Sequence, residues 1–207
     1  MHDKDYWEER YKQGKGSGEG SIGSYKKWKW EIIKHHVKDL DDILDVGCGD
    51  LSFWEGQDCQ KYTGIDFSSI IIENNQKLHP DWKFIVASAS DQLNVSARIV
   101  LCLDVLFHIM DENTYIKILN NLGLWSNEWL LIFTWEKNPF DKRKGIRKIL
   151  TKPKVTDGAY QYYRDFSKYV NILESHGFIL LETRSIDLSP SDESRPIGAM
   201  YVFKKVK

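Results

Sequence analysis

Short apolar runs alternate with helical patterns from residue 42 onward, and this alternation predicts the fold. Runs typical of buried strands occupy residues 42–46, 61–65, 82–86, 98–103, 129–134, 178–184 and 200–204, and helical patterns occupy residues 68–78, 112–122 and 161–175. Strands that alternate with helices are joined by right-handed crossovers, which produce a mainly parallel sheet covered on both faces. The pattern therefore predicts an α/β fold with a doubly wound, mainly parallel, seven-stranded sheet.

The last two strand-like runs differ from the others because no helical pattern lies between them. Residues 185–199 join them through a polar segment that contains Pro190 and Pro196. Such a connection favours a C-terminal antiparallel β-hairpin at one edge of the sheet. Gly123 and Gly177 follow two of the helical patterns, at positions where helix C-caps are expected.

The first 40 residues show a different pattern. Residues 3–12 have a helical pattern with an aromatic stripe, residues 14–23 contain five glycines, and a second helical pattern covers residues 24–38, with Ser24 as its expected N-cap. A glycine-rich segment of this kind is either a flexible linker or a lid hinged between two helices. We expect residues 1–40 to form a helical cap with a lid loop at 14–23, and residues 41–207 to form the α/β domain.

The composition is typical of a compact intracellular domain. The chain has 207 residues, with 29 Lys and Arg against 30 Asp and Glu, and a net charge near zero argues against bulk binding to nucleic acid or to an anionic membrane. The cysteines Cys48, Cys59 and Cys102 have no CxxC spacing, so we expect neither a disulfide framework nor a metal site, and a cytoplasmic location. No apolar run approaches the length of a membrane span.

The first strand-like run ends in a glycine-rich turn that is typical of a ligand site. Asp45 is followed by Gly47 and Gly49, and a turn without Cβ atoms lets a ligand approach the backbone closely. The second run leads to Asp66, about 20 residues downstream, where a carboxylate can accept hydrogen bonds from both hydroxyls of an adenosine ribose. Together these residues favour a nucleotide-type site over a purely structural turn.

Asp50 helps to identify the ligand. A dinucleotide places its pyrophosphate at a helix N-terminus, but here Asp50 is expected at that place, and Ser52 replaces the third glycine of G-x-G-x-x-G. Like charges at about 4 Å repel each other by roughly a few kcal/mol. A ligand with a ribose, no phosphate and a positive end fits better, and S-adenosylmethionine has these properties. The alternative for Asp50 is an ordinary helix N-cap.

The segment Asp45-x-Gly47-x-Gly49 followed by Asp66 resembles the first two motifs of the class I S-adenosylmethionine-dependent methyltransferases. The resemblance is clear over residues 40–135 and implies that family's Rossmann-like fold, with S-adenosylmethionine as the cofactor. It implies that Asp45 and Gly47 lie under the methionine part, with Gly49 in the same cofactor loop. It also implies that Asp66 binds the ribose and that Phe67 packs against the adenine.

Residues 5–11 are similar to the aromatic helix that often precedes such domains and closes over the cofactor. The resemblance therefore implies that the cap contacts the cofactor, and we expect Tyr11 and Ser24 to do so. The family usually has an acid after the third strand to bind the adenine amino group, but this position holds Ser88. Either Ser88 with the neighbouring backbone of Ala89 makes this contact, or Asp91 does so from a shifted register.

The fourth strand-like run continues into Leu103-Asp104-Val105-Leu106-Phe107-His108-Ile109, which resembles the family's Asp-Val-Leu-x-His-Ile segment. The resemblance implies that Leu103 and Asp104 lie at a strand tip beside the transferable methyl group. A neutral histidine has the pKa range needed to take a proton from a hydroxyl nucleophile, so His108 is the first candidate for a catalytic base, with Tyr162 behind it. The alternative is that His108 only hydrogen-bonds the backbone and holds the loop.

Two cationic stretches lie outside these motifs. Residues 142–148, extended by Lys152 and Lys154, follow the fifth strand, and residues 26–30 alternate Lys and Trp. Such runs are usually solvated faces; the alternative is a binding surface for an anionic acceptor.

The pattern as a whole predicts an S-adenosylmethionine-dependent methyltransferase that modifies oxygen or nitrogen of a small polar acceptor, such as a metabolite or a sugar. The small size favours a small-molecule substrate, with an anionic one as an option, over nucleic acid or a membrane. Two alternatives stay open: an NAD(P)-dependent oxidoreductase, which shares the strand–loop–strand pattern, and a non-catalytic protein that binds an adenosyl ligand. The oligomeric state leaves no mark in the sequence.

Overall fold

The computed structural model describes residues 3–143, 148, 151–186 and 198–206. They form a seven-stranded sheet in the order β3-β2-β1-β4-β5-β7-β6, in which β7 is antiparallel to both β5 and β6 and the other neighbouring strands are parallel. The predicted doubly wound sheet and its C-terminal hairpin are therefore confirmed. The strands are β1 (Ile43–Val46), β2 (Tyr62–Asp66), β3 (Lys83–Val86), β4 (Ala97–Leu103), β5 (Ser126–Trp135), β6 (Phe178–Ile186) and β7 (Gly198–Lys205).

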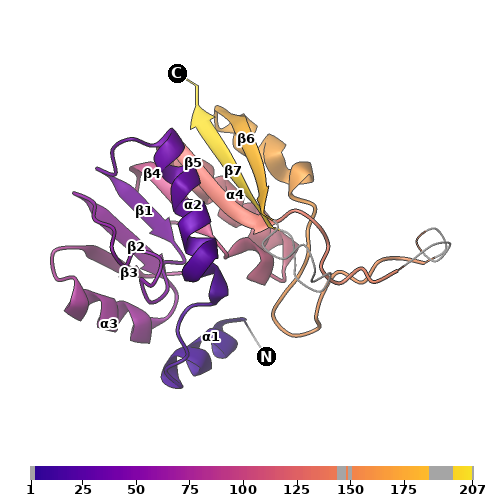
Figure 1. Cartoon of the computed structure of the whole chain (residues 1–207), viewed down its shortest axis with the longest axis horizontal. Helices are drawn as coiled ribbons and strands as arrows, with labels where there is room; N and C mark the ends of the chain where they lie inside the picture. Colours follow the sequence, from indigo (N-terminus) through magenta and orange to yellow (C-terminus); the bar gives the residue numbers. More distant parts are fainter. Residues whose placement is uncertain (1–2, 144–147, 149–150, 187–197, 207) are drawn as a thin grey trace.

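Helices cover both faces of the sheet (Figure 1). Two apolar clusters show this arrangement: one joins α2 and α3 to one face, and the other joins α4 and α6 to the opposite face. Because helices cover both faces of the sheet, its central strands are shielded from solvent, and every residue of β1 is buried. The α-helices are α1 (Asp3–Lys12), α2 (Gly23–His36), α3 (Ser69–Leu78), α4 (Glu112–Trp125) and α6 (Val170–Ser175), and the 3-10 helices are η1 (Glu19–Ser21), η2 (Leu106–His108) and η3 (Phe166–Tyr169).

The N-terminal segment packs in two different ways. Helix α2 lies across one face of the sheet and contributes Trp30, Ile32 and Ile33 to its apolar cluster. Helix α1 lies beyond the carboxyl ends of the parallel strands (Figure 1). The glycine-rich loop connects the two helices and contains η1. This arrangement places α1 and the loop at the sheet edge where ligands bind in open α/β folds.

The helix predicted over residues 161–175 is only partly present. Helical structure begins with η3 at Phe166, and the chain before it forms a turn closed by a bridge between Thr156 and Tyr162. Asp157 causes the difference because its Oδ1 accepts hydrogen bonds from the backbone N–H groups of residues 159, 160 and 161. Those N–H groups stabilise a tight turn in place of the first turns of a helix. We call residues 155–164 the arm.

Two helix ends also differ from the expectation. Gly123 does not end a helix but lies inside α4, which continues to Trp125. The ring of His176 packs so closely on Gly123 that a Cβ atom there would lie 2.6 Å from it. Ser24 is not an N-cap: α2 begins at Gly23, and no side chain caps this end. Gly177 does follow a helix end, with a positive φ of 84°.

Most of the predicted hairpin connection, with Pro190 and Pro196, lies outside the described residues, as do residues 144–147 of the first cationic stretch. Among the helices that the structure describes, none has the length and apolar character that crossing a membrane requires.

Close packing at Gly123 gives the first prediction. Gly123→Ala should lower the free energy of unfolding by about 1 kcal/mol, because displacing the His176 ring costs about 1–3 kcal/mol and the better helix propensity of Ala returns only about 1 kcal/mol. Urea denaturation measures this difference. In a His176→Ala background the clash is absent, so the same Gly123→Ala change should raise the free energy of unfolding. A loss of similar size in both backgrounds would show that the His176 ring is not the cause.

Candidate active site

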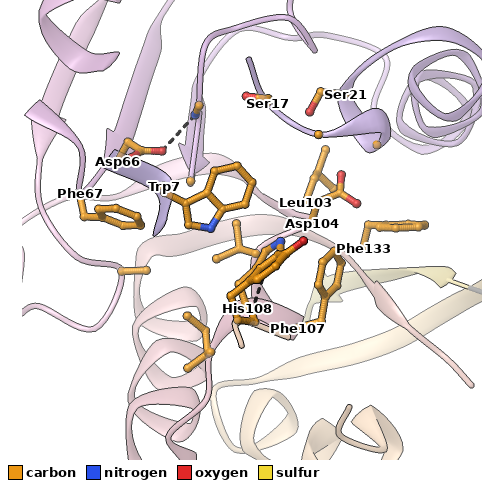
Figure 2. A pocket seen from close by; sticks show the side chains of 18 of the residues that line it. Trp7, Ser17, Ser21, Asp66, Phe67, Leu103, Asp104, Phe107, His108 and Phe133 are labelled. Atoms are coloured by element: carbon orange, nitrogen blue, oxygen red, sulfur yellow. Dashed lines mark hydrogen bonds between the residues drawn. The ribbon is translucent and has the colours of Figure 1, made fainter. Parts of the chain in front are cut away.

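A cavity of about 500 Å³ opens at the carboxyl ends of the parallel strands. The loops after β1, β2, β3 and β4 form its floor, and α1 and the glycine-rich loop cover it. Figure 2 shows Trp7 of α1 between Asp66 and Phe67 on one side and Phe107 and His108 on the other. Of the predicted site residues, the cavity is lined by Tyr11, Gly47, Gly49, Asp66, Phe67, Ser88, Ala89, Leu103, Asp104 and His108, whereas Ser24, Asp45 and Tyr162 are not among its lining residues.

Two glycines let the loop after β1 follow its path. Gly47 has φ 77° and Gly49 has φ 54°, a region that favours glycine. A Cβ atom on Gly47 would lie 2.4 Å from a methyl group of Val105, and one on Gly49 would lie 2.3 Å from the hydroxyl oxygen of Ser17. The loop is therefore a close-approach turn between the floor of the cavity and the glycine-rich loop.

Asp66 is held at the end of β2 by the backbone around it. One carboxylate oxygen accepts a hydrogen bond from the N–H of Gly49 at 3.1 Å, and the other accepts from the N–H of Ser68 at 3.0 Å. The residue is buried, and this burial raises its pKa to about 6. A carboxylate fixed in this way keeps further lone pairs for a ligand in the cavity.

Asp45 lies beneath the loop, not at the cavity surface. A single carboxylate oxygen accepts hydrogen bonds from the indole N–H of Trp54 at 2.7 Å and from the hydroxyl of Tyr62 at 2.9 Å. Complete burial raises its pKa to about 6. Its hydrogen-bonding partners are protein groups, and it is not among the residues that line the cavity in which a cofactor is expected.

Asp50 also acts differently from the expectation. Its carboxylate accepts hydrogen bonds from the N–H groups of Ser17 at 2.8 Å and Ser52 at 3.0 Å, and its own N–H donates to the Ser17 hydroxyl. These reciprocal bonds fasten the glycine-rich loop to the floor. Residues 49–61 contain turns and no helix. A dinucleotide places its pyrophosphate at a helix N-terminus, and this turn has none. The charge of Asp50 is therefore not needed to exclude a pyrophosphate.

A buried ion pair stands at the tip of β4. The side chain of Lys29 on α2 has no solvent exposure, and its ammonium contacts the carboxylate of Asp104. The same ammonium donates to the carbonyl of Gly20 at 3.0 Å and lies 4.0 Å from the centre of the Phe133 ring. Burial lowers the pKa of Lys29 below its ordinary value. Asp104 adopts a positive φ of 63°, and its carboxylate lies against Gly20 of the glycine-rich loop.

Lys29 was missed by sequence reasoning because a lysine in an amphipathic helix usually lies in solvent. The polar lining residues Arg10, Ser17, Ser21 and Tyr25 were missed as well. Tyr25 takes the place expected for Ser24, which is exposed. A glycine-rich segment with interspersed serines was the only signal for Ser17 and Ser21.

In the loop after β3, the two candidate groups for binding adenine lie in different places. Ser88 and Ala89 line the cavity and Asp91 does not. The Asp91 carboxylate accepts a hydrogen bond from the N–H of Ser88 at 2.8 Å, and the Ser88 hydroxyl lies 2.9 Å from that of Ser90. Asp91 therefore shapes the loop, and Ser88 with Ala89 forms the surface.

The other end of the cavity is aromatic. Tyr6, Trp7, Phe107, His108, Trp135 and Tyr160 line it, and we call these six residues the aromatic wall. Tyr162, the second candidate base, instead donates its N–H to the carbonyl of Phe107 at 2.8 Å and carries the Arg164 guanidinium over its ring at 4.4 Å. Of these two tyrosines, Tyr160 lines the cavity and Tyr162 does not.

His108 ends η2 and is held in one orientation. Its Nδ1 lies 3.1 Å from the carbonyl oxygen of Tyr160. A carbonyl only accepts, so Nδ1 carries the hydrogen and Nε2 keeps a lone pair. Burial lowers the pKa of His108 to about 4, so the ring is neutral at pH 7. The same contact serves the structural alternative, because it ties η2 to the arm.

Comparison with solved structures supports the fold. The magnesium protoporphyrin IX methyltransferase (ChlM) from Synechocystis PCC 6803 with bound S-adenosylhomocysteine aligns with a TM-score of 0.67 and 16% identity over 98% of this chain and 97% of that one. The N-methyltransferase NodS from Bradyrhizobium japonicum WM9 aligns with a TM-score of 0.71 and 11% identity over 100% of both chains. The 1,6-didemethyltoxoflavin-N1-methyltransferase from Burkholderia thailandensis aligns with a TM-score of 0.67 and 14% identity over 99% and 87%.

These similarities show that the chain has the fold of the class I S-adenosylmethionine-dependent methyltransferases, as the resemblance of its motifs implied. Comparison with protein-family models and with curated proteins finds no match.

The buried carboxyl of Asp45 gives the second prediction. An acid whose pKa is raised on folding stabilises the fold at low pH, and this contribution is lost as pH rises from about 3.8 to about 6. The loss amounts to about 3 kcal/mol at neutral pH. Asp45→Asn removes the titration, so the difference in unfolding free energy between variant and parent should shift in favour of the variant by up to about this amount between pH 4 and 7.

Urea denaturation at several pH values measures the shift. Asp81→Asn, at an exposed position, is the control and should keep a difference that is constant within about 0.5 kcal/mol. A constant difference for Asp45→Asn as well would show that Asp45 is already ionised at pH 4 in the folded protein.

Proposed function

We propose that this protein is an S-adenosylmethionine-dependent methyltransferase. The observation that carries the proposal is the cavity itself: a close-approach glycine turn and the fixed carboxylate of Asp66 face each other at the ligand-binding edge of a methyltransferase-type sheet. Neighbouring structures crystallised with S-adenosylhomocysteine or S-adenosylmethionine support the choice of cofactor.

The residues present fit this cofactor. Asp66 would hold the ribose, Phe67 and Ala89 would enclose the adenine, and Gly47 and Gly49 would leave room for the methionine part. The carboxylates of Asp66 and Asp104 favour a ligand with positive charge. When bound, S-adenosylmethionine supplies an electrophilic methyl group on a sulfonium.

The cap would exclude water from this reaction. We infer that α1 and the loop at residues 14–23 form the lid, because Asp50 binds Ser17 and Lys29 binds Gly20 only when the loop lies over the cavity. Arg10 adds a third bond by donating to the carbonyl of Gly16 at 2.8 Å. Methyl transfer is an in-line displacement, so the main tasks of the protein are alignment of the reacting atoms and exclusion of water.

His108 would act on the acceptor. Its neutral Nε2 would accept the proton that a hydroxyl loses as its oxygen takes the methyl group, or the proton that a neutral amine loses once methylation has made it an ammonium. The bond from Nδ1 to Tyr160 fixes the ring for this task. Small-molecule acceptors of oxygen or nitrogen type are the class that we propose, because the cavity has a volume of about 500 Å³ and must hold the cofactor as well.

Of the two alternatives, the oxidoreductase is disfavoured because no helix follows β1 in the described chain to hold a pyrophosphate. A non-catalytic adenosyl-ligand protein shares the cofactor pocket and would use His108 only to tie η2 to the arm. Titration with S-adenosylhomocysteine and NADH distinguishes the methyltransferase from the oxidoreductase. Transfer of a deuterated methyl group to a metabolite extract, followed by mass spectrometry, distinguishes it from the non-catalytic protein.

The third prediction concerns Asp66. S-adenosylhomocysteine should bind and NADH should not, and Asp66→Ala should weaken S-adenosylhomocysteine binding by roughly 1–3 kcal/mol through lost charge-assisted hydrogen bonds. Isothermal titration calorimetry measures both, with circular dichroism to check folding and the exposed Asp81→Ala as the matched control. Tight NADH binding without a response to S-adenosylhomocysteine would remove the proposal, and unchanged affinity in Asp66→Ala would remove the ribose assignment.

The fourth prediction separates the two roles of His108. In His108→Asn the side-chain amide can still donate to the Tyr160 carbonyl from the position of Nδ1, but the Nε2 lone pair is absent. For an acceptor that must lose a proton, kcat should fall by about 10²–10⁴-fold while S-adenosylhomocysteine affinity stays unchanged. A decrease of only a fewfold would mean that His108 holds the loop and takes no proton.

A further inference from the structure

The aromatic wall indicates which acceptor the enzyme takes. Resting on the proposed function, we propose that the methyl acceptor is a neutral, planar aromatic or heteroaromatic compound that binds against Trp7, His108 and Tyr160. This class differs from the sugar-type or anionic acceptor that the sequence suggested, and the geometry and charge of the wall both support it.

The rings of the wall meet as two nearly perpendicular planes. Tyr6 and Tyr160 stack with centroids 3.9 Å apart and an interplanar angle of 12°, and His108 is nearly parallel to Tyr160 at 15°. Trp7 stands at 85° to His108, with ring centroids 5.0 Å apart. A flat ring in this corner would lie face-on to one plane and edge-on to the other, which are the two favourable arrangements of aromatic pairs.

A second pair of rings extends the wall behind His108. Phe107 and Trp135 stack with centroids 4.5 Å apart and an interplanar angle of 4°, and Phe107 lies 4.5 Å from His108. Both side chains are almost completely buried. The wall therefore has a rigid base, and a planar ligand would add one more ring to an existing aromatic cluster.

The arm is built to hold Tyr160 in place. Asp157 binds three successive N–H groups around it, and Thr156 accepts and donates within the same turn. Arg164 fastens the arm to the loop after η2 by donating to the carbonyl of Met110 at 2.7 Å. A side chain that is fixed before the ligand arrives loses little conformational entropy on binding.

Little positive charge is available near the wall. His108 is uncharged at pH 7, Lys29 is paired with Asp104, and the Arg10 guanidinium donates to Gly16 and lies over Trp7 at 5.6 Å. Arg10 is also the one Lys or Arg among the described residues that line the cavity. The cationic stretches therefore do not supply an anion site here: Lys26, for example, donates to the carbonyls of Ser52 and Glu55.

A sugar would be a poorer fit for the same reasons. Each of its hydroxyls needs a hydrogen-bonding partner when water is removed. The wall offers mainly ring faces, and the one histidine nitrogen that donates is already bonded to the Tyr160 carbonyl. An aromatic compound loses little hydration and gains stacking.

The test compares three acceptor-like probes on protein saturated with S-adenosylhomocysteine: 5-hydroxyindole, N-acetylglucosamine and glucose 6-phosphate. The first two are neutral, and both carry a hydroxyl and an N–H group. We expect 5-hydroxyindole to bind at least about tenfold more tightly than either sugar, which corresponds to about 1.4 kcal/mol. Calorimetry or ligand-observed NMR measures the dissociation constants.

Two arm variants locate the binding. Tyr160→Leu keeps the backbone carbonyl that fixes His108 but removes the ring, and it should weaken 5-hydroxyindole binding about tenfold. Tyr163→Leu, on the same arm, is the matched control, because Tyr163 does not line the cavity and donates to the carbonyl of Glu136. This control should stay within twofold of the parent.

Three results would overturn the proposal: no measurable binding of 5-hydroxyindole, equal or tighter binding of either sugar, or an unchanged affinity in Tyr160→Leu. None of them touches the proposed function, which the preceding titration with S-adenosylhomocysteine tests by itself. If S-adenosylhomocysteine fails to bind, the methyltransferase assignment fails, and the same probes measured on the protein alone still decide whether the wall prefers aromatic compounds.

Discussion

The contact between the Lys29 ammonium and the Asp104 carboxylate fixes three parts of the chain at one point. A fully buried lysine costs several kcal/mol unless a partner neutralises it, and here that partner is supplied by the tip of β4, 75 residues away in sequence. The third participant is the carbonyl of Gly20 in the lid. The position of α2, the turn after β4 and the height of the lid are therefore set together, and any movement of one exposes an unpaired charge.

The floor of the site also contains buried ionisable groups that are held by protein partners, and here these groups are acids. Asp45 and Asp66 stand at the ends of neighbouring strands, and burial raises the pKa of both to about 6. Each carboxylate is held by protein donors, so their geometry persists without a ligand. A cationic ligand would favour the ionised form of Asp66, the member of the pair that lines the cavity.

The sheet was predictable because its strands are buried on both faces and form continuous apolar runs, and the site residues Gly47, Asp66 and Asp104 were predictable because parallel strands end at one edge. Other features depend on contacts that no local pattern records. In the sequence, Lys29 cannot be told from a solvent-exposed lysine of a helix, because its contact with Asp104 exists only in the folded chain. The arm was predicted as helix because its tyrosines fit a helical stripe, whereas Asp157 diverts the backbone into a turn and brings Tyr160 to the cavity.

The stacking of Tyr6 on Tyr160 has a consequence for the order of assembly. These rings come from distant parts of the sequence, the first helix and the arm that follows β5, and contacts of such long range carry a large cost of loop closure. Helix α1 also contacts α3, but its stacking on Tyr160 requires the arm to be in place. We therefore expect the enclosure around the reactive end of the cavity to form after the local elements, and local opening there would leave the sheet intact.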